Sequence, residues 1–209
     1  MNDGEQFKFW LMEKYPDLLD GTRDRLLGYG ELLREGTDRL GIVSRGDRDR
    51  VLMRHVRESL DPGLTRRLHD GEAVLDVGAG GGLPGIPLAI LRPDLRICLV
   101  EPRERKVAFL ERTALLLKIP NLEVWMGALE DRPRVSTRTL ASVALSRGIR
   151  WTEPMVRVLD DLLESEGRVI RFGAAKGISG VEVVPLQTDP SRAIQVWPRE
   201  AWVHLSGAR

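Results

Sequence analysis

A glycine-rich segment at residues 76–87 constrains the fold of this chain more than any other feature. It reads Asp-Val-Gly-Ala-Gly-Gly-Gly-Leu-Pro-Gly-Ile-Pro and follows an apolar stretch that begins at Ala73. Glycines permit positive φ and let the backbone approach a ligand closely. Pro84 and Pro87 suit the first turn of a helix, where free N–H groups have no partner within the helix. The segment therefore predicts a strand, a tight turn at a ligand, and a helix.

Strands and helices alternate along the rest of the chain. The stretch 139–145 is almost wholly apolar, as expected of a strand covered on both faces. Such alternation predicts an α/β fold with a doubly wound, mostly parallel sheet, whose ligand lies beyond the carboxyl ends of the strands near the switch point. The expected strands are 73–77, 96–100, 122–126, 139–145, 168–172, 181–186 and 193–205, and the expected helices are 83–91, 103–117 and 154–163.

The first part of the chain is predicted to be helical instead. Phe7, Trp10 and Leu11 have helical spacing, and Thr22 could cap a second helix. A third helix is expected at 47–60, with His55 on its apolar stripe. We therefore expect residues 1–67 to form a helical extension that packs on a core domain, residues 68–209, and contributes to its substrate site.

Charge restricts the way in which this chain could bind a nucleic acid. The formal net charge is only +1, so any such binding must come from a local basic patch. Residues 45–67 are the best candidate, because seven arginines stand there against four carboxylates. The same pattern also fits a solvated helix face with internal ion pairs, and charge alone does not choose between the two.

Metal and membrane sites are not expected. Cys98 is the only cysteine, and the three histidines, His55, His69 and His204, are far apart in sequence. No apolar run approaches the roughly 20 residues that span a bilayer, and residues 1–9 do not resemble a signal peptide. We expect a cytoplasmic protein without metal or membrane contact, and we favour a monomer.

Two nucleoside cofactors use a loop of this kind, and the glycine spacing separates them. A dinucleotide needs G-x-G-x-x-G directly after the strand, but the sixth position from Gly78 is Leu83. Gly78, Gly80 and Gly82 after Asp76 suit S-adenosylmethionine (SAM) better, since SAM has no phosphate. Glu101 follows 101 − 78 = 23 positions after Gly78 and could accept both ribose hydroxyls of either cofactor.

Read with its flanks, the loop resembles the RsmG (GidB) family of SAM-dependent methyltransferases, which act on a guanine N7 of bacterial 16S ribosomal RNA. The most specific match is the stretch 76–90, and its Leu-Pro-Gly-Ile-Pro portion is unusual among SAM enzymes. The resemblance runs from about residue 29 to about residue 177. Further matching pieces are Arg54-His55, Ser59, Arg105-Lys106-Val107, Phe109-Leu110, Ser146-Arg147 and Lys176-Gly177.

The resemblance implies a class I SAM-dependent methyltransferase with a Rossmann-like fold and a defined set of site residues. Glu101 would hold the ribose, while Leu129 and Glu130 would border the adenine. Arg147 would face both cofactor and substrate and would form the catalytic group with His55 and Lys176, which line the RNA side. The loop would contribute Asp76, Gly78, Ala79, Gly80, Gly82 and Leu83 to cofactor binding.

Plainer readings of these residues remain open from sequence alone. His55 could be a satisfied core histidine, Arg147 a strand-end ion pair, and Lys176 a solvated loop residue. The chain also departs from the family where a Trp-Asn pair and Asn-Leu-Thr are usual, and before the adenine-binding pair. Those positions read Gly36-Thr37, Gly41-Ile42-Val43 and Ala128, and Glu58 replaces an Asp.

These departures leave the SAM loop intact and fall mainly on the expected substrate side. The leading expectation is methylation of guanine N7 in 16S ribosomal RNA, with that RNA or the small ribosomal subunit, and not DNA, as the partner. The alternatives are a SAM methyltransferase for another RNA, a protein or a small molecule, or a SAM-binding ribosome-assembly factor without turnover.

Overall fold

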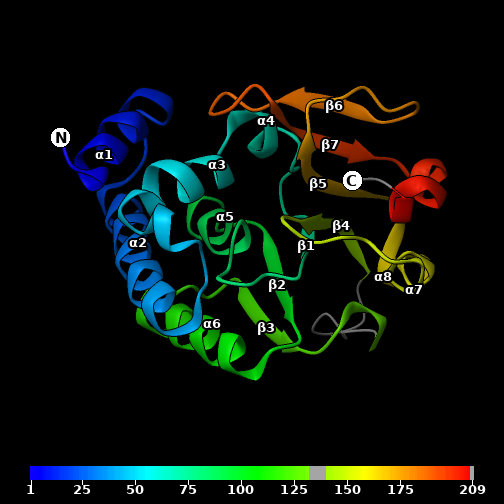
Figure 1. The fold of residues 1–209 in the computed structure, drawn as a ribbon, viewed down its shortest axis with the longest axis horizontal. Coiled ribbons are helices and arrows are strands. Elements are labelled where there is room, and N and C mark those ends of the chain that lie inside the picture. The colour runs from blue at the N-terminus through cyan, green and yellow to red at the C-terminus, as the bar shows by residue number, and fades with distance from the viewer. Residues whose placement is uncertain (132–139, 208–209) are drawn as a thin grey trace.

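A twisted sheet organises the fold of the chain (Figure 1). The computed structural model describes residues 1–131 and 140–207. In this part of the chain the sheet has the order β3-β2-β1-β4-β5-β7-β6. β7 pairs antiparallel with both β5 and β6, and all other neighbouring strands are parallel. The prediction of a doubly wound, mostly parallel sheet is confirmed. The strands are β1 Ala73–Val77, β2 Arg96–Glu101, β3 Leu122–Met126, β4 Ala141–Ser146, β5 Leu163–Ala174, β6 Glu182–Pro185 and β7 Arg192–Trp197.

The switch point lies beside β1. The chain moves outward from β1 through β2 to β3 and then returns to β4 on the other side of β1. At the end of β1, Val77 pairs with Val100 of β2 and Ser146 of β4. The segments that follow these three strands therefore meet at one edge of the sheet, where doubly wound folds bind ligands.

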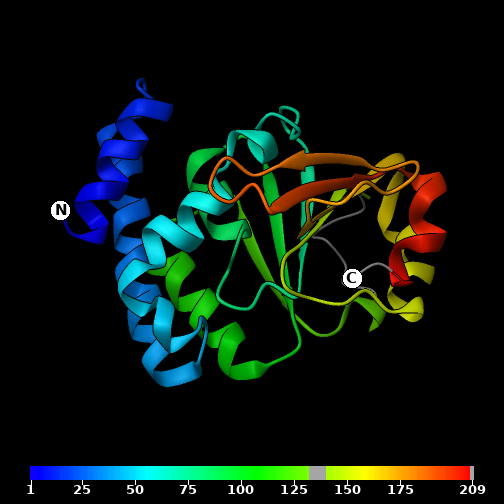
Figure 2. The ribbon, with the colours of Figure 1, turned by 45° about the horizontal axis from the view of Figure 1, so that its top comes forward.

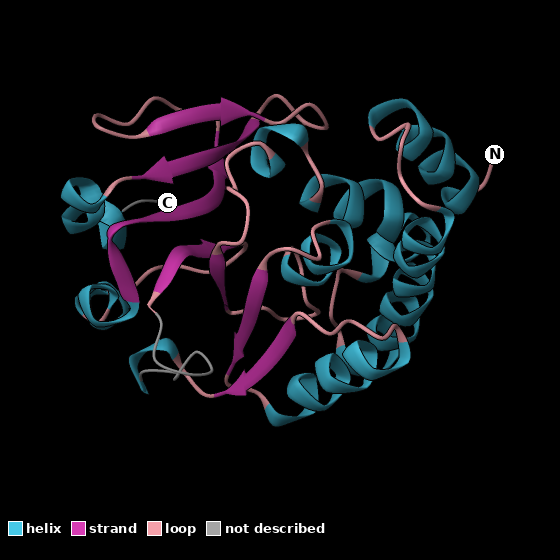
Figure 3. Ribbon diagram, turned by 180° about the vertical axis from the view of Figure 1, so that it is seen from behind, coloured by secondary structure: helices cyan, strands magenta, loops and turns pink. Residues whose placement is uncertain are grey.

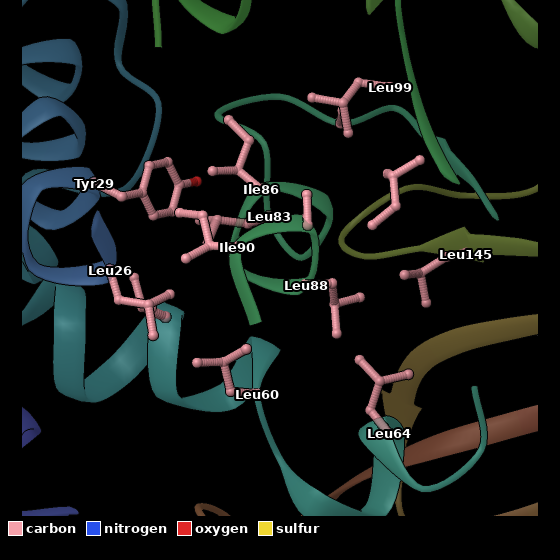
Figure 4. Close-up of a cluster of buried hydrophobic side chains, with 14 of the residues drawn as sticks. Leu26, Tyr29, Leu60, Leu64, Leu83, Ile86, Leu88, Ile90, Leu99 and Leu145 are labelled. Atoms are coloured by element: carbon pink, nitrogen blue, oxygen red, sulfur yellow. The ribbon is translucent and has the colours of Figure 1, made fainter. Parts of the chain in front are cut away.

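The N-terminal helices cover one face of the sheet together with α5 and α6 (Figures 1 and 2). Figure 4 shows Leu26 and Tyr29 of α2 against Ile86 and Ile90 of α5, all in one hydrophobic cluster that reaches Leu145 of β4. α2 thus packs on α5 and α6, which separate it from the sheet, and α1 packs against α2. The helices of this face are α1 Asp3–Lys14, α2 Asp20–Leu40, α5 Gly85–Leu91 and α6 Glu104–Leu116.

A second hydrophobic cluster covers the opposite face. Leu75 of β1 belongs to this cluster, whereas its neighbour Val74 belongs to the first, because successive strand side chains alternate between faces. Trp151, Trp197 and Trp202 are buried in it. Figure 3, seen from behind, shows the helical elements of the two faces on opposite sides of the sheet. The helical elements here are α7 Glu153–Arg157, α8 Leu159–Leu162 and the 3₁₀ segment η4 Arg199–Gly207.

The predicted third helix is replaced by short helical pieces. They are a 3₁₀ turn (η1) at Arg45–Arg50, a π turn (η2) at Leu52–Val56 and α3 Arg57–Ser59, followed by α4 Pro62–Thr65. The Asp3 carboxylate accepts hydrogen bonds from the backbone N–H groups of Leu52 and Met53 at 3.0 Å each. This long-range cap lets the helical path restart at Leu52, and its donor and acceptor are too far apart in sequence to be predicted.

Other boundaries also differ from the sequence prediction. Thr22 is buried within α2 instead of capping it, since α2 begins at Asp20. The predicted helix 154–163 divides at Val158 into α7 and α8. The predicted last strand ends at Trp197, because Pro198 follows and the Trp202 indole donates to the Trp197 carbonyl at 3.2 Å, which favours a helical turn.

The single cysteine, Cys98, is buried within β2. Residue 139, the expected start of the fourth strand, lies outside the described residues. Among the helices that the structure describes, none is both long and apolar enough to cross a bilayer.

Replacing Tyr29 tests how strongly the N-terminal helices hold the glycine loop. The fully buried Tyr29 hydroxyl donates a hydrogen bond to the Gly81 carbonyl at 2.8 Å. Tyr29→Phe leaves this buried carbonyl without its donor, so we expect the free energy of unfolding, measured by urea titration, to fall by about 1–3 kcal/mol. Tyr15→Phe is the control, because its bond to the Leu60 carbonyl is only partly buried and water can replace it. Equal losses for the two variants would contradict this prediction.

Candidate functional site

A cavity of about 410 Å³ lies at the carboxyl edge of the sheet, beside the switch point. This size lies within the range of about 300–1,000 Å³ that is usual for small-molecule sites. The glycine loop, the ends of β2 and β4, and the segment before η1 all contribute to its wall. Of the residues predicted for the site, it brings together His55, Gly78, Ala79, Gly80, Leu83, Glu101 and Arg147.

Backbone conformation explains the Gly-x-Gly-x-Gly spacing of the loop. Gly78, Gly80 and Gly82 have φ values of +70°, +60° and +91°, which residues with side chains rarely adopt. A Cβ on Gly78 would lie 2.6 Å from Ile149, and one on Gly82 would lie 2.4 Å from Ile86. A Cβ on Gly80 would meet no atom closer than 3.8 Å. Gly80 is therefore the position where the missing side chain leaves open space at the cavity.

Asp76 lies beneath the loop and does not line the cavity. Its Oδ2 accepts a hydrogen bond from the Gly85 backbone at 2.8 Å, at the start of α5. Its Oδ1 has no hydrogen-bond partner among the described residues, and burial raises the pKa of this carboxyl to about 7. The structure thus gives Asp76 a role in fixing the turn into α5.

Glu101 joins the loop to the end of β2. One of its oxygens accepts from the Gly80 backbone N–H at 2.9 Å, and the other accepts from Arg103 N–H at 3.1 Å. Glu101 is only 3% exposed, yet it lines the cavity. A carboxylate offers about four acceptor sites, so two remain for a bound ligand such as a ribose.

Arg147 follows β4 and is held in place by residues of the N-terminal segment. Its Nη2 lies 2.8 Å from Glu58 Oε2 and 2.6 Å from His55 Nδ1, and its Nη1 donates to the His55 carbonyl at 3.2 Å. The Arg147 side chain is 11% exposed, and the ring of Phe172 lies 5.8 Å from its guanidinium carbon. Arg147 is therefore ion-paired and also lines the cavity, and its catalytic role stays a prediction.

His55 is neutral in this arrangement. Burial, and next the positive charge of Arg147, lower its pKa to about 4. A guanidinium is always a donor, so His55 Nδ1 accepts and the ring proton is on Nε2, 3.3 Å from Asp47 Oδ2. The Nδ1 lone pair is already used, so His55 orients Arg147 and is not available as a general base.

The buried Glu58 and the half-exposed Arg192 complete this group of charges and were not predicted for the site. Glu58 is 3% exposed and forms ion pairs with both Arg147 and Arg192. Arg192 begins β7, so the group connects the N-terminal segment to two strands. The signal in the sequence was the change from the usual Asp to Glu58, but no local pattern pointed to Arg192.

Several predicted site residues do not line the cavity. Gly82 packs against Ile86 and Leu110 below the loop, and Leu129 is buried in the second hydrophobic cluster. Glu130, in the short 3₁₀ turn η3 Leu129–Asp131, lies 3.5 Å from the Thr152 hydroxyl, and Lys176 is exposed.

Other residues that line the cavity were not predicted as site residues. They are Ile42, Val43, Gly81, Pro102, Arg103, Lys106, Gly148 and Ile149. In the sequence, Ile42 and Val43 stand out only as departures from a family pattern, and Lys106 only as part of a matching piece.

Comparison with known proteins identifies the family. The sequence model of the family described as rRNA small subunit methyltransferase G, GidB, matches residues 22–182. The chain belongs to this family. A Ribosomal RNA small subunit methyltransferase G of Neisseria gonorrhoeae is 31% identical over 75% of this chain and 76% of its own length. The protein of the same name from Beutenbergia cavernae is 37% identical over 66% of each chain.

Solved structures show the same fold. A SAM-dependent methyltransferase from Aquifex aeolicus superposes with a TM-score of 0.53, covering 68% of this chain and 91% of that one at 14% identity. Ile42 and Val43, which occupy positions where the family pattern has Asn-Leu-Thr, line the cavity. The departures from the family pattern therefore reach the wall of the site and leave the glycine loop unchanged.

The neutral state of His55 predicts a specific loss of stability in acid. Its folded pKa of about 4 lies below the ordinary 6.5, so the unfolded chain binds the proton first as pH falls. The free energy of unfolding should therefore fall between pH 6.5 and pH 4, by about 3 kcal/mol at most from this group. His55→Gln should lack this part of the pH dependence in parallel urea titrations. Curves of the same shape for both proteins would show that His55 is not held neutral.

Proposed function

We propose that this protein transfers a methyl group from SAM to guanine N7 of 16S ribosomal RNA. As a member of its family it is a SAM-dependent methyltransferase, and its fold is the class I Rossmann-like fold of such enzymes. The observation that carries the proposal is the cavity at the switch point, which the open position at Gly80 lines together with Glu101 and Arg147.

The residues around the cavity suit SAM. We propose that the backbone at Gly78, Ala79, Gly80 and Leu83 borders the cofactor and that the free acceptor sites of Glu101 take the ribose hydroxyls. Asp76 and Gly82 support this loop from below. Arg103 and Lys106 line the same cavity and are suited to the cofactor carboxylate. Leu129 and Glu130 remain our prediction for the adenine end. When bound, SAM supplies an electrophilic methyl group on its sulfonium.

The proposed reaction needs no general base. Guanine N7 already carries an in-plane lone pair, so no proton has to leave before the methyl group is transferred. This agrees with a neutral His55 whose Nδ1 is engaged by Arg147. The contribution of the protein is then mainly to place N7 in line with the methyl group at near-attack distance. Arg147, fixed by Glu58 and His55, is suited to orient the RNA at that point.

The RNA side of the site is built in part by the N-terminal segment. Ile42, Val43 and His55 line the cavity although they precede the sheet in the sequence. We propose that residues 1–67 form the substrate side of the site and that the target base leaves its stack to reach the cavity. Lys176, exposed after β5, is our prediction for a further RNA contact.

The direct test is methyl transfer from radiolabelled SAM to small ribosomal subunits and to protein-free 16S ribosomal RNA. Mass mapping of the labelled RNA should find N7-methylguanosine. Label in protein or in small molecules only, or SAM binding without any transfer, would contradict the proposal.

Gly80→Asp tests the position of the cofactor. The new side chain would occupy the open space at the cavity, and its carboxylate would lie near Lys106, where it would compete with the SAM carboxylate and repel it. We expect SAM binding to be lost in titration calorimetry while circular dichroism stays unchanged. Gly180→Asp is the control, since Gly180 has a similar φ of +73° and open surroundings away from the cavity. Unchanged SAM affinity for Gly80→Asp would place the cofactor elsewhere.

Arg147→Lys tests the role of the guanidinium. Lysine keeps a positive charge beside Glu58 but cannot reproduce the planar fork that reaches His55 and the substrate, so we expect turnover to fall about tenfold or more. SAM affinity should change several-fold at most, and the two values would come from single-turnover methylation and from titration. Arg168→Lys is the matched control, because Arg168 forms a similarly buried ion pair with Glu72 away from the cavity. Equal turnover for wild type and Arg147→Lys would make Arg147 a purely structural residue.

A further inference from the structure

A basic hollow lies beside the cofactor cavity, between the C-terminal end of α2 and the first turns of α6. Its volume is about 450 Å³, and four cationic side chains line it. They are Arg39, Arg103, Arg105 and Lys106, which we call the α2–α6 basic surface. α2 and α6 lie side by side in both views of the ribbon (Figures 1 and 2). The surface combines two segments more than 60 positions apart in sequence, so no charge run in the sequence revealed it.

The charges of this surface are not neutralised within the protein. None of its four side chains forms a hydrogen bond or ion pair with another residue in the described ranges 1–131 and 140–207, and Arg39, Arg103 and Arg105 are exposed. Glu104 is the one carboxylate that lines the hollow, so its lining carries 4 − 1 = +3 charges. The whole chain carries only +1. Positive charge is therefore concentrated here.

The basic segment that the sequence suggested behaves differently. Within residues 45–67, Arg48 pairs with Asp38, Arg54 with Asp47, and Arg67 with Glu182. Arg57 lies over the ring of Trp10 at 5.7 Å. Much of that charge is thus already satisfied inside the protein and is less available to an external anion.

The hollow adjoins the cofactor cavity, because Arg103 and Lys106 line both. With these two side chains suited to the cofactor carboxylate, Arg39 and Arg105 are left to meet a polyanion whose reacting base enters the cavity. Guanidinium forks match phosphate geometry, and phosphate contacts position a nucleic acid without reading its sequence. We propose that the α2–α6 basic surface, through Arg39 and Arg105, binds the phosphodiester backbone of the RNA substrate. This inference rests on the proposed function and adds the surface along which the RNA lies.

The experiment compares two double variants of equal charge. Arg39→Glu/Arg105→Glu alters the basic surface but spares Arg103 and Lys106 at the cofactor cavity. Arg96→Glu/Lys118→Glu alters two exposed cationic side chains, one at the amino end of β2 and one four residues before β3, at the opposite edge of the sheet. Both change the net charge from +1 to 1 − 4 = −3, so a difference between them cannot come from total charge. Filter binding of a 16S ribosomal RNA transcript over a KCl series gives the affinity and its salt dependence.

We expect Arg39→Glu/Arg105→Glu to weaken RNA binding about tenfold or more at low salt. The slope of log affinity against log salt should become shallower by roughly 1.5, which corresponds to two lost phosphate contacts. SAM affinity should stay unchanged, and the Arg96→Glu/Lys118→Glu protein should bind RNA within about twofold of wild type.

Two failures are distinguishable. If wild type methylates the RNA and both double variants bind it equally, the α2–α6 basic surface is not the RNA path and only this inference is wrong. If wild type neither binds nor methylates ribosomal RNA, the proposed function itself is wrong, and this inference falls with it.

Discussion

The loop between β1 and α5 keeps its shape because groups from three different elements bind its backbone. Glu101 of β2 accepts from Gly80, Asp76 of β1 accepts from Gly85, and Tyr29 of α2 donates to the Gly81 carbonyl. Backbone that forms no helix or sheet ladder must find such partners when it is buried. The cavity, the neighbouring strand ends and the N-terminal helices are all connected through these hydrogen bonds, so a change in any one of them reaches the site.

The charged group around Arg147 is a second feature on which the site depends. Glu58 comes from the N-terminal segment, Arg147 follows β4, and Arg192 begins β7. Removing Glu58 would leave the buried charge of Arg147 without its ion-pair partner, which is much more costly than losing an exposed ion pair. This explains how a guanidinium at the cavity is held in one orientation. It also explains why the N-terminal segment contributes to the site although its helices α1 and α2 lie over a face of the sheet and not at its carboxyl edge.

The distribution of the remaining charge separates two tasks. Arg147 is paired and oriented, which suits the placement of one group at the reacting centre. Arg39 and Arg105 are exposed and have no partner among the described residues, which suits contacts with successive phosphates. A nearly neutral protein can bind an RNA in this way, because association depends on the local field near the site more than on the total charge.

Sequence alone determined the sheet, the loop and the cofactor class. Alternating strands and helices predicted the doubly wound fold, since periodicity reports which faces are buried, and Gly78, Gly80 and Gly82 marked the positions that take positive φ. Glu101 was found because it ends the strand beside the loop. These signals come from residues that are close together in the sequence, so they can be read from a single sequence.

Only the tertiary structure decided which side chains meet. The Asp3 cap at Leu52, the pairing of Glu58 with Arg147 and Arg192, and the position of Ile42 at the cavity join residues distant in sequence. Charge counts placed the basic patch at residues 45–67, but they cannot show which arginines find carboxylates in space. Several arginines of that patch form ion pairs within the protein, whereas Arg39 and Arg105 have no partner among the described residues. Electrostatic interactions depend on distance and burial and not on order along the chain, so the sequence could not show this difference.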